Sequence, residues 1–410
     1  MAESDESSGA FRAIELNGRV VHATCGWASK SQVLSIYQAG EASSGQTRLP
    51  RYAESFGAVE VDSCTYAIPS GDVTKRWVDA TPDGFQFIVK AFGGFCAPSV
   101  DVKSLPRDVR EALASSSSAA SRVKYATMST AAKDILWDKM NAALAPMRDA
   151  GKLAMVVFQF HTTQEPSETL REHVLECQSR LQRGGGRVNV AVEFRNREWV
   201  MGDVGEATVR WCKENDLCLV AADELEHETA QSDRDQRGLP HGAVRRRMYT
   251  RLETTCDWGS LIRVHRRHGT TERVLDADDI EFWARTISNA APPQKSAPTY
   301  VAWGTEWLDA PLTNAKALDA ALDAIQHNAW TYDWYGTRHH RTSKPLPTKS
   351  KSVTIADMFA AAKQPTAPPL DVNRTPSPSA KKRKLASPAR TAPNSTSLAE
   401  LWARPREPKR

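Results

Sequence analysis

Between residues 18 and 303 the chain repeats one pattern: a short apolar run, a polar residue at its end, and then a longer segment with helical periodicity. Short apolar runs rich in β-branched residues are typical of buried strands, and amphipathic segments between them are typical of helices that pack on a sheet. Eight such runs occur, at 19–27, 57–62, 85–90, 153–160, 188–195, 217–223, 260–266 and 298–303. The clearest amphipathic segments between them are 134–150, 167–182, 203–216 and 276–289.

Strands that alternate with helices predict an α/β fold with a parallel sheet, because a parallel connection must cross back over the face of the sheet. Eight such units within roughly 250 residues predict a closed, TIM-like (β/α)8 barrel. An open doubly wound sheet is the alternative, although no glycine-rich phosphate fingerprint follows the first run. Two segments interrupt the pattern: 43–50 is predicted to be a loop, and the Ser/Ala-rich segment 112–131 a low-complexity insertion.

The composition changes sharply after residue 343. Residues 344–410 hold 11 of the 23 prolines, and 14 Lys or Arg against 4 Asp or Glu. That segment therefore carries a net charge of +10, and subtracting it from the total of +5 leaves −5 for residues 1–343. We predict a barrel over 18–343, between a disordered N-terminus (1–17) and a disordered, basic, Pro-rich tail.

These counts limit the classes of partner. A mildly acidic barrel argues against a broad basic surface for duplex DNA, but the basic segments 245–247 and 265–269 leave nucleic-acid contact open beside a solvated face. The N-terminus is acidic and polar, and no apolar run is long enough to cross a bilayer, so we expect no membrane partner. The seven cysteines are scattered without a CxxC pair, which favours reduced intracellular thiols.

Six of the eight runs carry a polar or charged side chain at or near their ends. In a closed barrel these ends converge on one face, where the chemistry of such barrels is found. The sequence therefore predicts a ligand-binding or active site at that rim. Its polar candidates are Asp62, Lys90, Gln159, Glu193, Arg195, Asp223, Arg263 and His265.

The chain also resembles the DUF72 (YecE-like) family of TIM-like barrels, whose activity is poorly defined. The resemblance is carried, in the family's order, by TCGW (24–27), VEVDSCTYAIP (59–69), RWVDATPDGFQFIVKA (76–91), VVFQF (156–160), VAVEFRNREW (190–199), AAD (221–223), IRVH (262–265) and APLTNAKAL (310–318). It implies a pocket lined or supported by Trp27, Glu60, Asp62, Tyr66, Lys90, Gln159, Glu193, Arg195, Trp199, Asp223, Arg263, His265 and Asn314.

Three places depart from the family's pattern. The family usually has Asn where this chain has Asp62, and it favours other residues than AFGGFC (91–96) after the third strand and AWGTEW (302–307) near the last. The resemblance therefore leaves open both a changed substrate preference and a loss of activity.

The rim residues suggest two kinds of chemistry. Lys90, Arg195, Arg263 and His265 would form an anion clamp, because Arg guanidinium groups suit phosphate or carboxylate. The carboxylates of Glu193, Asp223 and Asp62, with His265, would hold a divalent metal or act as general acid and base; Glu193 and Asp223 are the metal candidates. A phosphoester would use both sets.

Each of these residues also has a structural interpretation. Glu193 and Arg195 lie two apart on one strand face and would pair with each other. His265 would be a core histidine, and Trp27 and Trp303 would be rim packing instead of a stacking platform for a base or sugar. The sequence does not separate these alternatives.

The tail contains a basic cluster, KKRK, at Lys381, Lys382, Arg383 and Lys384. In a Pro/Ser/Thr-rich context such a cluster resembles a nuclear localisation signal of the eukaryotic type, whose partner would be a nuclear import receptor. Thr375, Ser377 and Ser387 each precede a proline, so phosphates there would lower the local positive charge. A solvated charge run is the alternative.

The tail also contains an internal repeat, because SVTIADMFA (352–360) matches STSLAELWA (395–403) by residue type at every position. The apolar groups fall at i, i+3 and i+4, on one face of a short helix; they are Ile355, Met358 and Phe359 in the first copy and Leu398, Leu401 and Trp402 in the second. One helical turn cannot fold alone, so each copy is expected to order on a groove-bearing partner. The spacing resembles peptides that bind the sliding clamp of replication and repair, without their usual leading Gln.

These features lead to two hypotheses. In the first, the chain is a nuclear, metal-assisted hydrolase of the phosphoesterase type, acting on a phosphoester or nucleic-acid-derived substrate and recruited to a replication or repair complex by its tail. In the second, the pocket is degenerate and the barrel is a non-catalytic ligand- or protein-binding scaffold. The sequence names neither the substrate nor the metal.

The tail yields a direct test of location. A fluorescent protein fused to residues 345–410 is expected to accumulate in nuclei, because the basic cluster would bind an import receptor. Microscopy of the same fusion with alanine at positions 381–384 provides the control and should show an even distribution. Equal distributions of the two fusions would contradict nuclear targeting.

Overall fold

The structure is a computed structural model, and it describes residues 20–29, 37, 45–114, 121–223, 250–265, 274–290, 297–304, 309–327, 330–332 and 338–340. The chain divides into two units, 1–345 and 346–410, and every described residue belongs to the first. Within the described part, no helix is both long enough and apolar enough to span a membrane.

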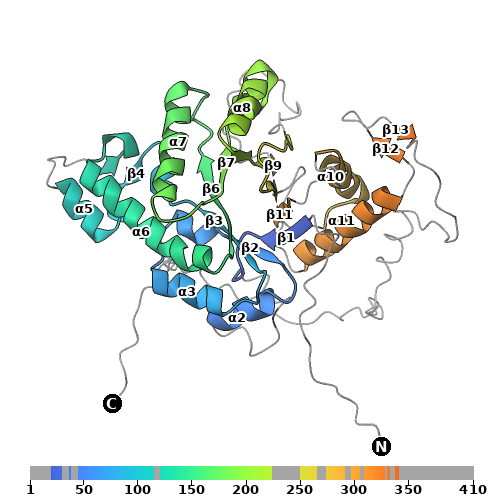
Figure 1. Ribbon diagram of the computed structural model, residues 1–410, viewed down its shortest axis with the longest axis horizontal. Coiled ribbons are helices and arrows are strands. Elements are labelled where there is room, and N and C mark those ends of the chain that lie inside the picture. Colours follow the sequence, from blue (N-terminus) through green and yellow to red (C-terminus); the bar gives the residue numbers. More distant parts are fainter. Residues whose placement is uncertain are drawn as a thin grey trace, which may run out of the picture. The chain divides into compact units, whose positions relative to one another are not determined.

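Eight parallel strands form the centre of the described unit, as the sequence predicts (Figure 1). They pair in the orders β2-β3-β6-β7-β8 and β1-β11-β10-β9, and β8 and β9 are two parts of one strand interrupted at Val220. Their bounds are β1 Val20–Thr24, β2 Ala58–Val61, β3 Gln86–Lys90, β6 Leu153–Phe160, β7 Val190–Phe194, β8 Leu217–Leu219, β9 Ala221–Asp223, β10 Ser260–Val264 and β11 Thr299–Trp303. This order is that of a TIM-like barrel, so the predicted fold class is confirmed.

The two halves of the barrel meet at two seams. At one seam, the Val220 backbone N–H donates to the Val192 carbonyl at 2.9 Å and keeps β8 and β9 in line. At the other, the Tyr52 hydroxyl accepts from the Thr24 backbone N–H at 2.9 Å and donates to the Ala58 carbonyl at 3.0 Å. The tyrosine thus bridges β1 and β2, which lie side by side without a direct strand ladder.

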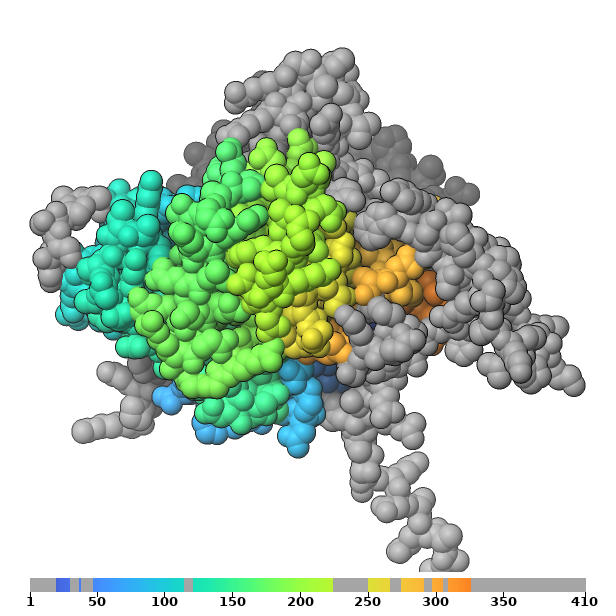
Figure 2. Space-filling model, turned by 45° about the horizontal axis from the view of Figure 1, so that its top comes forward, coloured from blue at the N-terminus to red at the C-terminus, as the bar shows by residue number. Residues whose placement is uncertain are grey.

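Helices surround these strands (Figure 1). The longer ones are α3 Gly71–Asp79, α5 Arg107–Ala114, α6 Thr130–Asp149, α7 Glu168–Gln182, α8 Gly202–Glu214, α10 Ala277–Ala290 and α11 Ala310–His327. Helices α7 and α8 lie side by side on one face of the molecule (Figure 2), where the Arg171 guanidinium of α7 lies 5.7 Å from the Trp211 ring of α8. Four of these helices, α6, α7, α8 and α10, match the predicted amphipathic segments to within a few residues.

Shorter elements complete the described chain. They are α2 Gly45–Tyr52, α4 Gly93–Cys96, β4 Val100–Asp101, β5 Arg122–Val123, β12 Trp330–Tyr332, β13 Arg338–His340 and four 3-10 turns, η1 Asp62–Thr65, η2 Val102–Ser104, η3 Tyr125–Thr127 and η4 Arg197–Val200. The antiparallel pairs are β4 with β5 and β12 with β13.

The prediction of a loop at 43–50 is wrong, because α2 occupies most of that segment. Its glycine and proline favour a loop by local preference. Leu49 and Tyr52 are nonetheless fully buried, and the Tyr52 hydroxyl closes the seam between β1 and β2. Tertiary packing therefore outweighs the local preference. The Ser/Ala-rich segment 112–131 is only partly described, with the end of α5, then β5, η3 and the start of α6.

The barrel interior is apolar at its centre and becomes polar toward the carboxyl ends of the strands. Small and medium apolar side chains from all eight strands form one buried cluster, which includes Ala23, Ala58, Ile88, Met155, Ala191, Cys218, Leu261, Tyr300 and Ala302. Side chains alternate between the two faces of a strand. Glu60, Lys90, Glu193 and Arg263 each stand two residues beyond a member of this cluster, and therefore share its inward direction.

A buried lysine fastens the amino-terminal side of the barrel. Lys152, just before β6, donates from Nζ to the Val78 carbonyl at 3.0 Å and to the Thr81 carbonyl at 2.7 Å. The side chain is nearly inaccessible, and both acceptors lie at the C-terminal end of α3. A cation there also complements the negative end of the helix dipole. Lys152 therefore links the C-terminal end of α3 to the start of β6.

Replacing Lys152 tests this role. The Lys152→Met substitution keeps the apolar stem but removes the donor to the buried Thr81 carbonyl, whereas the Val78 carbonyl keeps the donors of Thr81, so it should lower the free energy of unfolding by about 1–3 kcal/mol. Urea denaturation of the full chain measures the change. Lys75→Met in α3 is the matched control, because Lys75 is exposed and its pair with Asp79 should contribute less than about 1 kcal/mol. Equal stability of the two variants would contradict the role.

Candidate functional site

Arg263 crosses the interior of the barrel near the carboxyl ends of the strands. From β10, its Nε and Nη2 atoms donate to the two oxygens of Glu60 on β2, each at 2.8 Å. Its Nη1 atom donates to Glu193 Oε2 on β7 at 2.7 Å. All three side chains are almost completely buried. The guanidinium thus bridges two carboxylates that come from distant strands.

Alanines make room for this crossing. In the strand register, Arg263 lies opposite Ala222 of β9 on one side and Ala302 of β11 on the other, and Ala302 lies opposite Ala23 of β1. Larger residues at this level would fill the space that the Arg263 side chain needs to reach β2. In the sequence these alanines look like ordinary apolar core residues. Only the strand register shows that they lie beside Arg263.

A row of hydrogen-bonding side chains runs across four neighbouring strands. Gln159 and Glu193 are register partners on β6 and β7, and Gln159 Nε2 donates to Glu193 Oε1 at 2.7 Å. Gln159 Oε1 accepts from Lys90 Nζ of β3 at 3.2 Å. Lys90 Nζ in turn lies 2.6 Å from Asp62 Oδ1, just after β2. The structure therefore brings together four of the residues predicted at the rim.

Glu193 is the most heavily engaged member of this row. Besides the bonds from Gln159 and Arg263, its Oε1 atom accepts from Arg195 Nε at 3.2 Å. Burial by itself would raise the pKa of Glu193, but Arg263, Arg195 and Lys90 outweigh it and hold that pKa well below the usual range. Glu193 is therefore an ionised carboxylate whose two oxygens are both occupied, in line with the ion-pair interpretation of Glu193 and Arg195.

His265 lies two residues beyond Arg263, directly after β10. Burial, and then the nearby Arg263 cation, lower the pKa of His265 to about 3, so its imidazole is neutral at physiological pH. Its Nδ1 atom is buried without a hydrogen-bond partner among the described residues. A Cβ at Gly304 would stand 2.8 Å from His265 Cδ2, so glycine at that position leaves room for the ring.

Asp223 does not join these carboxylates. It pairs in register with Val264, the neighbour of inward-pointing Arg263, and partners in a parallel ladder share a face. Asp223 therefore points away from the barrel interior, whereas Glu193 points into it. The strand register therefore places the predicted metal pair, Glu193 and Asp223, on opposite strand faces. No group of three or more His, Cys, Asp or Glu side chains in the described ranges has a metal-binding arrangement.

Three further predicted ligand residues are buried in packing roles. The Trp199 ring is fully buried, stacks on Phe194 at 4.1 Å and donates from Nε1 to the Gln164 carbonyl. Asn314 is buried on α11 and accepts from the Leu275 backbone N–H at 2.8 Å. Trp27 is also buried, with its ring 5.3 Å from that of Trp77. These residues support the barrel, and their rings and amide are enclosed by protein.

Trp303, the alternative stacking platform, is also enclosed. Its Nε1 atom donates to His22 Nδ1 at 3.1 Å, so the His22 proton is on Nε2, which contacts Asp319 Oδ1 at 2.9 Å. This chain of contacts links β11, β1 and α11 outside the barrel. In contrast, Tyr66 is 71% exposed and the Asp62 side chain is 33% exposed. Among the described candidates, only Tyr66 is exposed, and Asp62 is partly so.

Sequence reasoning missed two neighbours of the site. Cys25, just after β1, places its Sγ atom 4.0 Å from Arg263 Nη2. Gly304 makes room for His265, as described above. Their positions directly after β1 and β11 are a signal that strand-end reasoning could have used, although neither carries a charge. The tail residues predicted for nuclear targeting and docking, 381–384, 352–360 and 395–403, lie outside the described residues.

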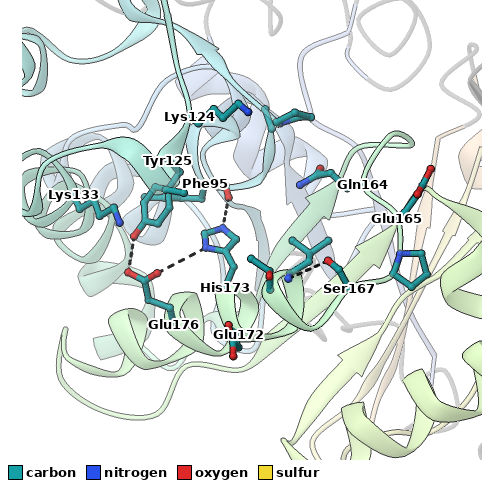
Figure 3. A pocket seen from close by; sticks show the side chains of 16 residues that line it. Phe95, Lys124, Tyr125, Lys133, Gln164, Glu165, Ser167, Glu172, His173 and Glu176 are labelled. Atoms are coloured by element: carbon teal, nitrogen blue, oxygen red, sulfur yellow. Dashed lines mark hydrogen bonds and ion pairs between the residues drawn. The ribbon is translucent and has the colours of Figure 1, made fainter. Parts of the chain in front are cut away.

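A separate groove of about 680 Å³ lies on the outside of the barrel between α4, α6 and α7 (Figure 3). At one end, Tyr125 donates to Glu176 Oε1 at 3.1 Å, and His173 Nε2 donates to the Phe95 carbonyl at 2.7 Å. Lys124 and Lys133 line the groove together with the carboxylates Glu165, Glu172 and Glu176. Because its walls carry both signs of charge, the groove indicates no single class of ligand.

Comparisons with known proteins agree on one family. The family model described as "Protein of unknown function DUF72" matches residues 21–337. The UPF0759 protein YunF of Bacillus subtilis (strain 168) is 30% identical over 179 residues, which is 44% of this chain and about half (52%) of that relative.

Solved structures show the same fold. A DUF72 family protein from Enterococcus faecalis V583 superposes with a TM-score of 0.50 at 16% identity, covering 73% of this chain and 98% of that one. A DUF72 family protein from Thermotoga maritima MSB8 superposes with a TM-score of 0.50 at 15% identity, covering 76% and 100%. At such identities the likeness establishes the fold alone.

The Arg263 bridge makes a prediction about stability. Arg263→Met would leave Glu60 and Glu193 buried without the guanidinium, which should cost about 3–5 kcal/mol of unfolding free energy. Because the folded pKa of Glu193 is depressed, its contribution in the wild type is present above about pH 4.3 and is lost as the pH falls. The difference in unfolding free energy between the wild type and Arg263→Met, measured by urea denaturation, should therefore become smaller below that pH. The double variant Arg263→Met, Glu60→Met should recover part of the loss; a double variant less stable than the single one would refute the bridge.

Proposed function

Because the chain belongs to the DUF72 family, whose description names no activity, we propose a function from the geometry of the barrel mouth: binding of a small ligand through one phosphate or carboxylate group. One observation carries the proposal. The ammonium group of Lys90 is nearly buried at the carboxyl end of β3, and among the described residues it contacts acceptors for two of its three donors.

The number of hydrogen-bond donors on Lys90 supports this proposal. An ammonium group has three N–H donors. Among the described residues, the Lys90 Nζ atom contacts two acceptors, Asp62 Oδ1 at 2.6 Å and Gln159 Oε1 at 3.2 Å. A buried donor without an acceptor is costly, and a ligand oxygen would satisfy it. Charge-assisted hydrogen bonds of this kind are the stronger ones, which favours an anionic oxygen.

The charges around Lys90 limit the ligand. The network pairs three cations, Lys90, Arg195 and Arg263, with three carboxylates, Glu60, Glu193 and Asp62. Arg263 is buried and donates to Glu60 and Glu193, and His265 is neutral. Of the four-residue anion clamp predicted from the sequence, the proposal therefore rests on Lys90. Among the described residues this network is balanced in charge, which favours a single anionic group over a polyphosphate, because further negative charges would need further cations to offset them.

The geometry of the barrel mouth favours ligand binding over metal-assisted hydrolysis. The oxygens of Glu193 already accept from Gln159, Arg195 and Arg263, so a metal ion would have to break one of these bonds. The second metal candidate, Asp223, lies on the opposite strand face. The non-catalytic alternative that the sequence leaves open is therefore the better supported one. For the tail, nuclear targeting and docking to a partner such as the sliding clamp stay predictions.

Calorimetry of the full chain tests the binding site. Inorganic phosphate and glycerol 3-phosphate should bind, and Lys90→Met should weaken binding about tenfold or more, the effect expected for one charged hydrogen bond. Lys75→Met is the control, because Lys75 is an exposed lysine of α3 and should bind as the wild type does. Binding should be the same in EDTA and in added Mg²⁺ or Mn²⁺.

A different outcome would reinstate the enzyme hypothesis. Release of phosphate from glycerol 3-phosphate that requires a divalent metal, and that Glu193→Gln abolishes, would show metal-assisted hydrolysis at Glu193. Unchanged affinity in the Lys90→Met variant would place any binding elsewhere. Thermal melting of each variant confirms that it is folded before its affinity is compared.

A further inference from the structure

The most exposed large aromatic side chain in the described ranges belongs to the rim of the barrel. Tyr66 follows the 3-10 turn η1, directly after β2, and 71% of it is exposed. The other aromatic candidates at the rim, Trp27 and Trp303, are buried. Among the described aromatic residues at this rim, Tyr66 is therefore the one whose ring a planar ligand can stack on.

The turn that carries Tyr66 is firmly anchored. Cys64 within the turn is buried, and the Tyr66 backbone N–H donates to the Ser63 carbonyl at 3.1 Å. A Cβ at Gly93 would stand 3.0 Å from the Thr65 carbonyl oxygen, so the backbone of α4 packs closely against the turn. A ring that projects from an anchored backbone loses little conformational freedom when a ligand stacks on it.

The same turn begins beside Lys90, the proposed contact of the anion. Asp62 is the first residue of η1, and its Oδ1 atom lies 2.6 Å from Lys90 Nζ. Since a 3-10 turn rises about 2 Å per residue, the backbone of Tyr66 stands about 8 Å along the turn from that of Asp62. One small molecule can thus contact both Lys90 and the Tyr66 ring.

We propose that the ligand is a phosphate monoester joined to a planar ring, as in a nucleoside monophosphate. The phosphate contacts Lys90, the ring stacks on Tyr66, and the exposed part of the Asp62 carboxylate accepts from a hydroxyl group of the portion between them. Aromatic side chains stack on nucleobases with little dependence on the base, so the site would read the presence of a ring more than its identity. This inference rests on the proposed anion site and adds the ring.

Calorimetry with the full chain separates the two claims. The ligands are glycerol 3-phosphate, AMP, UMP, phenyl phosphate and adenosine. AMP and UMP should bind about tenfold or more tightly than glycerol 3-phosphate, the size expected for one stacked base. Tyr66→Ala should remove that advantage and leave glycerol 3-phosphate unchanged, whereas Tyr66→Phe, which keeps the ring, should retain it.

The remaining ligands show whether the site prefers a nucleotide to another phosphate that carries a ring. If AMP binds more tightly than phenyl phosphate, and Asp62→Asn reduces only this difference, the hydroxyl contact and the nucleotide class are supported. Equal affinity of ring-bearing and ring-free phosphates, or an equal loss of both in Tyr66→Ala, would overturn the inference while the anion site stands. Binding of adenosine as tight as AMP, or no binding of any phosphate, would overturn the anion site as well.

Discussion

The guanidinium of Arg263, held between Glu60 and Glu193, is the interaction on which the barrel mouth depends. It joins β10 to β2 and β7 across the interior, with three charged hydrogen bonds of 2.7–2.8 Å. A buried ion triad of this kind offers little net stability, because desolvation of the charges offsets their attraction. Removing one member is costly, however, so the triad constrains which side chains the barrel can hold at this level.

That constraint extends to the residues nearer the rim. With Glu193 Oε2 committed to Arg263, Oε1 is left to Gln159 and Arg195, and this fixes the Gln159 amide with its oxygen toward Lys90. Lys90 then contacts Asp62, at the start of the turn that carries Tyr66. The bridge deep in the barrel thus orients the groups that a ligand would touch, although it is itself inaccessible to one.

Strand-end reasoning identified most residues of this hydrogen-bonded network, because alternation and parallel strands bring inward-pointing residues to one level. Lys90, Gln159, Glu193, Arg195 and Arg263 were all identified in this way. The other predicted residues lie outside this network for physical reasons. Asp223 ends its strand one residue out of phase with the inward face, and Trp199 and Asn314 belong to loops and helices whose polar atoms bond to nearby backbone groups. The segment 43–50 was misjudged because burial of Leu49 and Tyr52 is not visible in local composition.

By itself, the sequence determined the eight-stranded barrel, since the period of its apolar runs and the helices between them admit few other arrangements. It also determined which charged residues stand at the strand ends. Only the tertiary structure decided how those charges pair. Arg263 meets Glu193 across 70 residues and Glu60 across 203, through a space left by alanines on three other strands. Pairing at such separations depends on barrel closure and strand register, which no local pattern encodes.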